Sequence, residues 1–479
     1  MSTKRVIAID LGAESGRVMQ VSFDGNSLHS DEIHRFANQP VTVSGTLYWD
    51  ALRLFHEITT GIRAVPAGAA SLGIDTWGVD FAFLDRDGRL LANPLHYRDR
   101  SWEGMMDWVF ERVPRRELYQ RTGLQIIAVN GIWRLAGLVR NHSPLLEIAH
   151  TYLTLPDLFN YWLSGSKTCE FTHASTHQLY NPRLNNWDME LIQRLGVPTA
   201  VFGEIVPPGT TLGEYQGIRV IAPPTHDTGS AVVAVPTVTD DYAYCSSGTW
   251  SLLGLELPEA VIDDAAYEAN ITNEGGAENT WRFLKNIAGM WLVQQCRATW
   301  AAQGTTYEYP QLAAMAEEAP PFTAFIDPDE GDFYQPGDMP AHIRAFCDRT
   351  GQTAPETVGA FVRIIYESLA MKYRYVLDQV CRVAGRKAEV FHIIGGGSRN
   401  ALLCQMTADA TGRVVVAGPA EATALGNAIV QLVALGEFKD IAEARRLLSE
   451  TAGTVTYEPR HTDAWEEAYA RFLKVLTVK

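Results

Sequence analysis

Cysteine and positive charge are both scarce in this chain. Its 479 residues include six cysteines, with no Cys-x-x-Cys pair, at Cys169, Cys245, Cys296, Cys347, Cys381 and Cys404. Such scattered cysteines exclude a structural zinc site and favour a reducing compartment. Lysine and arginine number 40 against 56 aspartates and glutamates, a net charge of −16. Because nucleic acids and anionic membranes bind cationic surfaces, this balance argues against both as partners.

Long hydrophobic runs are also absent. No apolar stretch approaches the roughly 18 residues that a membrane helix needs, and Asp10 interrupts the first apolar run at Ile9. We therefore expect a soluble, cytoplasmic protein. Hydrophobic side chains still make up 46% of the chain, enough to fill two cores. We expect two domains, 1–237 and 238–479, each with mixed α/β structure.

Three common catalytic motifs are missing. The chain contains no Gly-x-x-x-x-Gly-Lys-[Ser/Thr], no Gly-x-Ser-x-Gly and no His-Glu-x-x-His. Their absence excludes the phosphate loop, the hydrolase serine turn and the zinc protease helix.

The first segment with a chemical pattern is 6–17. Four apolar residues lead to Asp10, a small-residue turn follows, and Arg17 opens an alternating stretch typical of a return strand. Backbone N–H groups in such a turn can approach an anion closely. Taken alone, the pattern fits a phosphate-binding hairpin or an ordinary hairpin with an aspartate at its turn.

Two later segments repeat this theme. Residues 242–255 again read as strand, small hydroxylic turn and return strand, with Thr249 in the turn. A predicted strand at 390–394 ends in three glycines, Gly395–Gly397, before an amphipathic helix at 401–410. Glycines at a strand end let a flat ligand lie against the backbone, although a plain turn fits the same residues.

The remaining pattern alternates strands and helices. We expect strands at 28–36, 69–76, 79–84 and 218–222, with 69–76 and 79–84 paired around Trp77 and Gly78. Helices are predicted at 50–62, 230–235 and 357–383. The segment 102–162 is predicted to be helix-rich, with prolines at helix starts.

Together, the segments 10–17, 246–250 and 395–400 resemble the two phosphate hairpins and the adenosine loop of actin-like ATPases. Within that group the chain resembles the FGGY carbohydrate kinases over nearly its whole length. Four segments are similar to those of the members that phosphorylate L-rhamnulose: 73–81, 226–228, 271–276 and 284–292. The last two are long enough to be far more specific than a three-residue motif.

The resemblance implies a fold and a reaction. The fold would be α/β, with two RNase H-like domains and an active-site cleft between them. The reaction would be ATP-dependent phosphorylation of L-rhamnulose on its 1-hydroxyl, giving L-rhamnulose 1-phosphate and ADP in L-rhamnose degradation. A monomer or weak homodimer is expected.

Asp227 and Asp10 are the central residues of this prediction. Asp227 lies between a strand and an apolar helix and would be the base that accepts the sugar hydroxyl proton; it could equally be a helix N-cap. Asp10 would bind Mg²⁺ through ordered waters, since Mg²⁺ prefers carboxylate and phosphate oxygens and keeps part of its hydration shell.

The other site residues follow from the resemblance. For ATP they are Ala13, Glu14, Ser15, Gly16, Arg17, Thr249, Gln294, Gly396, Gly397 and Asn400. For the sugar they are Trp77, Gly78, Asp80, His226, Asp227, Thr228 and Asn286. A helix beginning near Leu284 is expected to carry Asn286, Met290 and Gln294 on one face, unless those residues simply face solvent. Hypotheses for the apolar wall around the sugar methyl are Trp77, Phe81 and Trp291.

Two further patterns are expected to be structural. His173 and His177 have the spacing of helical metal ligands, but no third ligand is evident, and we expect them at the surface or cleft edge. The acidic run 327–332 is predicted to be a solvated loop.

Two alternatives remain open. A sibling kinase acting on fuculose, xylulose or ribulose would share the ATP residues. A catalytically dead sugar- or nucleotide-binding regulator is the other, and the presence of Asp10, Asp227 and Thr249 argues against it.

Overall fold

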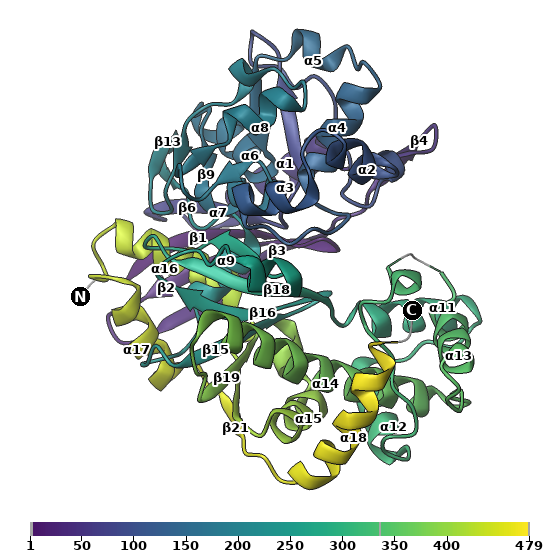
Figure 1. Cartoon of the computed structure of the whole chain (residues 1–479). Coiled ribbons are helices and arrows are strands. Elements are labelled where there is room, and N and C mark those ends of the chain that lie inside the picture. The colour runs from purple at the N-terminus through teal and green to yellow at the C-terminus, as the bar shows by residue number, and fades with distance from the viewer. Residues whose placement is uncertain (1–2, 335–336, 478–479) are drawn as a thin grey trace. The chain divides into compact units, whose positions relative to one another are not determined.

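A computed structural model of the chain describes residues 3–334 and 337–477, and it divides into two compact units (Figure 1). The first comprises the chain up to Val238 together with Glu256–Phe283 and Ala422–Thr451. The second comprises Thr239–Leu255, Leu284–Glu421 and the chain from Ala452 onward. The first segment of the first unit ends at Val238, one residue after the predicted boundary at 237/238. The two later segments return to the first unit, which a single boundary in chain order cannot describe.

A six-stranded sheet forms the centre of the first unit, in the order β13-β14-β6-β1-β2-β3. Its strands are β1 (Lys4–Leu11), β2 (Ser15–Phe23), β3 (Leu28–Ala37), β6 (Ser71–Thr76), β13 (Thr211–Tyr215) and β14 (Ile218–Ile221). The antiparallel pairing of β1 and β2 confirms the predicted first hairpin and sets Asp10 opposite Arg17. Parallel pairing of β1 with β6 sets Asp75 beside Asp10.

Helices cover this sheet through their apolar faces. They include α1 (Ala51–Ala64), α9 (Asp227–Val233) and α16 (Ala422–Ala434), and α16 packs on β1 and β6. In α1, buried side chains recur every three or four residues, as expected for a helix with one face on the core. Helices α9 and α16 approach so closely that a Cβ at Gly426 would overlap the Ser230 carbonyl. This close contact fixes α9 against α16, which itself packs on the sheet.

The segment 102–162, which follows β6 in the chain, is helix-rich, as predicted. It contains α2 (Met105–Phe110), α3 (Arg115–Thr122), α4 (Gly131–Arg140), α5 (Leu145–Ile148) and α6 (Leu155–Ser164). Prolines stand at or next to the starts of α3, α5 and α6, where a missing N–H costs nothing.

The predicted pairing of 69–76 with 79–84 is wrong. Strand β7 (Phe81–Leu84) pairs instead with β8 (Thr151–Thr154), far along the chain. Residues 77–80 therefore form a turn that leaves the main sheet at the end of β6. Two short apolar runs look alike whichever partner they take, so the pattern could not tell these pairings apart.

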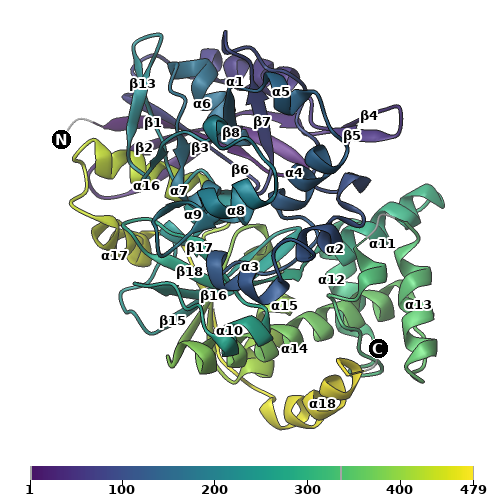
Figure 2. The same ribbon diagram turned by 45° about the horizontal axis from the view of Figure 1, so that its top comes forward.

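The second unit is built on strands β15 (Tyr242–Ser247), β16 (Trp250–Leu257), β19 (Val390–Ile394), β20 (Val414–Ala417) and β21 (Val455–Tyr457). They lie in the order β16-β15-β19-β20-β21, and the β15–β16 pair confirms the second predicted hairpin. The helices α14 (Val358–Ala384), α15 (Ala401–Thr411) and α18 (Thr462–Val475) pack against one another (Figure 2).

The predicted helix from Leu284 is also wrong. Residues Trp281–Ala288 form strand β18, and helix α11 begins only at Trp291 and ends at Ala302. Asn286 is therefore on a strand and Gln294 on a helix, so they do not share a helix face. Among the described residues, no helix is both long and apolar enough to span a membrane.

Candidate active site

The turn between β1 and β2 is tightly held through its carbonyl groups. Gly12 N–H donates to the Ser15 carbonyl at 3.0 Å, and the Asn38 side chain and backbone donate to the Gly12 and Glu14 carbonyls, both at 2.9 Å. No hydrogen bond from the described residues reaches Ala13, so its N–H is available to an anion. A Cβ at Gly16 would overlap the Phe36 ring, so packing alone already requires this glycine.

Asp10 lies at the end of β1 and is 5% exposed. Its carboxylate forms an ion pair with the Arg17 guanidinium across the hairpin. Asp75, beside it on β6, accepts a hydrogen bond from the Asn427 side chain at 2.6 Å. Burial, reinforced by the charge of Asp10, raises the pKa of Asp75 well above its usual range. One carboxyl of this adjacent pair is thus paired with a cation, and its neighbour favours the protonated form.

The segment that carries Asp227 leaves β14 through two prolines and enters α9. His226 is the N-cap of α9 and Asp227 is its first residue, so Asp227 is not the N-cap itself. Its Oδ1 accepts the N–H of Thr228 at 2.6 Å, and the side chain is 27% exposed. Burial raises the pKa of Asp227, His226 opposes this, and Asp10 adds to it. The group is accessible and more basic than an ordinary aspartate, as a proton acceptor should be.

His226 is oriented by a buried arginine and a buried glutamate. The Arg282 Nη2 lies 2.9 Å from His226 Nδ1, and Glu274 Oε2 lies within 3.2 Å of Arg282 and 3.3 Å of His226 Nδ1. A guanidinium can only donate, so Nδ1 accepts from it and Nε2 carries the imidazole proton. Nε2 is 3.5 Å from Asp227 Oδ1. The histidine therefore turns a donor toward the candidate base.

The turn 77–80 lies against His226. A Cβ on Gly78 would be 3.1 Å from His226 Nε2 and 3.3 Å from Thr176 Oγ1, so glycine permits this approach. Within the described chain, no hydrogen bond reaches the N–H or carbonyl of Gly78. Both groups are thus available to a hydroxyl-rich ligand. Val79 has a φ of 71°, a strained conformation for a β-branched residue.

Asp80 is fully buried and has its oxygens occupied. Oδ2 accepts the indole N–H groups of Trp49 at 2.6 Å and Trp77 at 2.7 Å, and Oδ1 accepts from Arg134 at 2.8 Å. The Trp77 ring lies 4.1 Å from that of Trp49. In this arrangement Asp80 and Trp77 shape the turn, and direct sugar contact by either remains a prediction.

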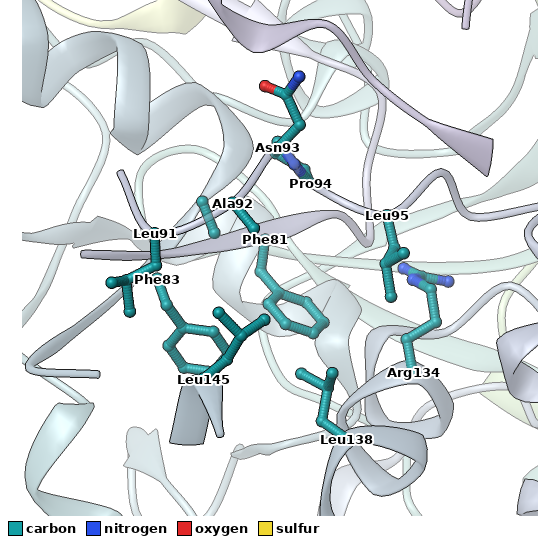
Figure 3. A pocket seen from close by; sticks show the side chains of 11 residues that line it. Phe81, Phe83, Leu91, Ala92, Asn93, Pro94, Leu95, Arg134, Leu138 and Leu145 are labelled. Atoms are coloured by element: carbon teal, nitrogen blue, oxygen red, sulfur yellow. The ribbon is translucent and has the colours of Figure 1, made fainter. Parts of the chain in front are cut away.

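Phe81, a hypothesised wall for the sugar methyl, lines a small apolar cavity of about 40 Å³ together with Phe83, Leu138 and Leu145. Figure 3 shows its ring in the middle of this lining, and the Asn93 amide turned away. A cavity of this size holds only a few waters, so it is too small for a ketose. The Phe81 residue is 8% exposed, and its contact with the sugar remains a prediction.

In the second unit, two predicted nucleotide residues lie together. Gln294 Nε2 donates to Thr249 Oγ1 at 3.3 Å. The Gly248–Thr249 turn is fixed by the N–H groups of Gly289, Met290 and Trp291, at 3.1 to 3.2 Å. The buried Gln294 Oε1 has no hydrogen-bond partner among the described residues. An orphaned acceptor beside a fixed hydroxyl fits a polar ligand such as a nucleotide.

The glycine turn after β19 divides into packed and open positions. A Cβ at Gly397 would overlap the Ser247 hydroxyl, whereas nothing lies within 4 Å of one at Gly396. Gly395 has a φ of 79°, which favours glycine. Asn400 caps α15 by accepting the Leu403 N–H at 3.1 Å. The open face at Gly396 agrees with a flat ligand against the backbone.

Surface placement is wrong for His173 and His177, and it is right only in part for the acidic run, in which Asp332 is exposed. His173 and His177 are fully buried, with His173 Nδ1 3.1 Å from His177 Nε2. In the acidic run, Asp327 and Asp329 are half-buried and pair with Lys372 at 2.7 and 3.0 Å. Both sets have partners distant in sequence, which the local pattern could not reveal.

Four buried charged residues that support the site were not predicted from the sequence. Arg134, Glu170, Glu274 and Arg282 are buried charged side chains that hold the turn 77–80 or the segment 225–227. Isolated charges in apolar surroundings are the one signal that could have found them, because such groups are buried only when paired.

Residues 5–220 match the N-terminal domain and residues 243–435 the C-terminal domain of the FGGY family of carbohydrate kinases. The chain belongs to this family of phosphotransferases. It is 45% identical over 478 residues to the rhamnulokinase of Bacteroides thetaiotaomicron, covering 97% of this chain and 98% of the relative. Over 485 residues it is 40% identical to the Enterococcus faecalis rhamnulokinase, with coverages of 98% and 97%.

Solved structures of other family members share the fold. The ligand-bound xylulose kinase of Lactobacillus acidophilus has a TM-score of 0.81 at 15% identity, covering 98% of this chain and 97% of that one. The glycerol kinase of Plasmodium falciparum with ADP has a TM-score of 0.79 at 14% identity, with coverages of 100% and 99%. These likenesses confirm the predicted two-domain actin-like ATPase fold.

Proposed function

We propose that this chain transfers the γ-phosphoryl group of ATP to the 1-hydroxyl of L-rhamnulose, giving L-rhamnulose 1-phosphate and ADP. The observation that carries the proposal is the position of Asp227, an accessible carboxyl of raised pKa beside His226 and the open Gly78 peptide. Identity of 45% to a rhamnulokinase over nearly the whole chain supports this sugar over other ketoses.

In this proposal Asp227 orients the 1-hydroxyl and takes its proton as the oxygen bonds to phosphorus and ADP leaves. Because phosphoryl transfer passes through a loose transition state, most of the work is positioning. The sugar would contact Gly78, His226, Thr228 and Asn286. The donor on His226 Nε2 and the free groups of Gly78 provide hydrogen bonds that hold the ketose during transfer.

Each unit carries residues that this proposal assigns to ATP. The turn from Ala13 to Arg17 belongs to the first unit, and Thr249, Gln294, Gly396, Gly397 and Asn400 belong to the second. The available Ala13 N–H and the orphaned Gln294 Oε1 support these assignments.

Mg²⁺ fits the carboxylate of Asp10 with phosphate oxygens and waters as the remaining ligands. Among the described residues, no cluster of three His, Cys, Asp or Glu side chains is arranged to hold a metal alone, which agrees with a metal that arrives with the nucleotide. When bound, Mg²⁺ would neutralise charge on the transferring phosphoryl group. Arg17, paired with Asp10 here, is placed to contact a phosphate once the metal takes its partner.

A panel of ketoses tests the proposal. ADP release would be measured with ATP, Mg²⁺ and L-rhamnulose, L-fuculose, D-xylulose or L-ribulose, and the phosphorylated carbon located by NMR. We expect the highest kcat/KM with L-rhamnulose and phosphate on O1. A higher kcat/KM for another ketose would reject the substrate but retain the kinase, and sugar binding without ADP release would favour a regulator.

A further inference from the structure

Three buried side chains form a row of hydrogen bonds from Tyr152 to the backbone of the turn 77–80. The Tyr152 hydroxyl lies 2.6 Å from His177 Nδ1, His177 Nε2 lies 3.1 Å from His173 Nδ1, and His173 Nε2 lies 2.9 Å from the Trp77 carbonyl oxygen. Each of the three side chains is at most 1% exposed. Tyr152 is on β8, His173 is on the short helix α7 (Phe171–Ala174), and His177 is on the 3-10 turn η2 (Ser175–His177).

Only one arrangement of protons satisfies this chain. A carbonyl oxygen can only accept, so His173 Nε2 donates to Trp77 and His173 Nδ1 must accept. His177 Nε2 therefore donates to His173, and His177 Nδ1 accepts from the Tyr152 hydroxyl. Burial lowers the pKa of His173 to about 3 and that of His177 well below its usual range, so both rings are neutral.

The same short segment holds the other side of Gly78. Thr176 lies between the two histidines; its Oγ1 accepts the Val79 N–H at 3.0 Å and donates to the His173 carbonyl at 2.8 Å. The Val79 carbonyl accepts from Arg134 at 2.6 Å. The peptide groups flanking Gly78 are thus fixed, although Val79 has a strained φ of 71°. Strain of this kind persists only where surrounding contacts enforce it.

Gly131 shows how closely these parts fit. A Cβ at this first residue of α4 would lie 2.7 Å from His177 Nδ1 and 2.9 Å from the Val79 carbonyl oxygen. Gly131 therefore lies against both His177 and the strained turn, and a larger residue there would overlap both.

We propose that Tyr152, His177 and His173 form a one-directional hydrogen-bond chain that positions the Gly78 peptide for sugar binding. These are positioning residues, since none is assigned to touch substrate. The proposal rests on the proposed function in one respect, namely that Gly78 binds the ketose. It also assigns His173 and His177 a role that does not involve a metal.

Tyr152→Phe tests the chain by removing only its terminal hydroxyl. Losing one net hydrogen bond of about 1 kcal/mol would raise the KM for L-rhamnulose about fivefold, with kcat and the KM for ATP within about twofold of wild type. The matched control is Tyr119→Phe, which loses an equally buried hydroxyl that donates to the Ile271 carbonyl at 2.6 Å. This control should leave the KM for the sugar unchanged.

Nitrogen-15 NMR of labelled histidines supplies a readout that does not depend on activity. Signals would be assigned by their loss in His173→Gln and His177→Gln. In the wild type both rings should be neutral Nε2–H tautomers, and in Tyr152→Phe the His177 Nδ1 signal should shift because it loses its donor.

Thr176→Val should also raise the sugar KM, and Thr176→Ser should restore it.

An Nδ1–H tautomer or a doubly protonated ring in the wild type at neutral pH would overturn the proposal. A shifted NMR signal with an unchanged sugar KM would overturn the positioning role, as would an equal rise of KM in Tyr119→Phe. Failure of the wild type to phosphorylate L-rhamnulose would instead reject the proposed substrate. The kinetic comparison would then use whichever ketose is phosphorylated, and the NMR comparison would stand unchanged.

Discussion

Glu170 accepts two hydrogen bonds from Thr225, which lies two residues before the candidate base Asp227. Its Oε2 accepts both the backbone N–H of Thr225 at 2.9 Å and its hydroxyl at 2.8 Å. The same carboxylate accepts the Thr172 N–H and hydroxyl, and the Thr172 hydroxyl accepts the His226 N–H at 3.2 Å. One fully buried carboxylate thus ties the start of α7 to the loop that leads to Asp227.

Glu170→Gln should separate positioning from general stability. The carboxylate oxygens now accept hydrogen bonds from backbone N–H and hydroxyl groups. The NH₂ group of the glutamine amide cannot accept these hydrogen bonds, so some of the donors would lose their acceptor. We expect kcat to fall about tenfold, with a smaller change in the KM for ATP, because the base segment loses its fixed position. Steady-state kinetics and thermal unfolding would be measured together.

Glu367→Gln is the matched control for this prediction. Glu367 is also a fully buried carboxylate that accepts a backbone N–H, from Phe322 at 2.9 Å, and it lies in the second unit. If both variants lose the same stability and the same kcat, the effect of Glu170 is not specific to the base segment.

Asp227→Asn tests the base directly. The amide is isosteric but cannot take the hydroxyl proton, so we expect kcat to fall about 10² to 10⁴-fold while calorimetry still detects sugar and nucleotide binding. The raised pKa of Asp227 adds a pH signature: wild-type kcat/KM should rise with pH as this group ionises, and the variant should lack that rise. The exposed Asp87→Asn serves as control, and near-normal turnover in Asp227→Asn would remove the assignment.

Local patterns and distant contacts explain what the sequence could reveal. The hairpin that places Asp10 opposite Arg17 depends on neighbours in the chain, so alternation and turn residues predicted it. Asn286 was misplaced on a helix because a short polar and apolar mixture fits either element. Glu170 and His177 were missed or misjudged because their partners lie on segments far apart in sequence, and no single-sequence pattern records such pairing.

The buried Asp157 predicts an unusual dependence of stability on pH. Its side chain is 2% exposed, and burial, reinforced by the charge of Glu170 and opposed by a hydrogen bond from Thr154, raises its pKa to about 7. The unfolded chain would ionise near pH 4. Between these values the folded protein holds a proton that the unfolded chain has released. Stability therefore falls as pH rises, by up to about 1.4 kcal/mol per pH unit from this group.

Asp157→Asn should remove that dependence, because an amide neither ionises nor pays for desolvating a charge. Urea midpoints of unfolding would be measured at pH 5, 6, 7 and 8. The midpoint of the variant should rise relative to that of the wild type as pH rises to about 7, with little further change above pH 7. Asn keeps an oxygen that can accept the N–H of Glu170, now donated to Asp157 at 3.1 Å. The exposed Asp87→Asn should show no such trend. A difference between Asp157→Asn and wild type that stays constant from pH 5 to 8 would mean that Asp157 ionises at its ordinary pH despite its burial.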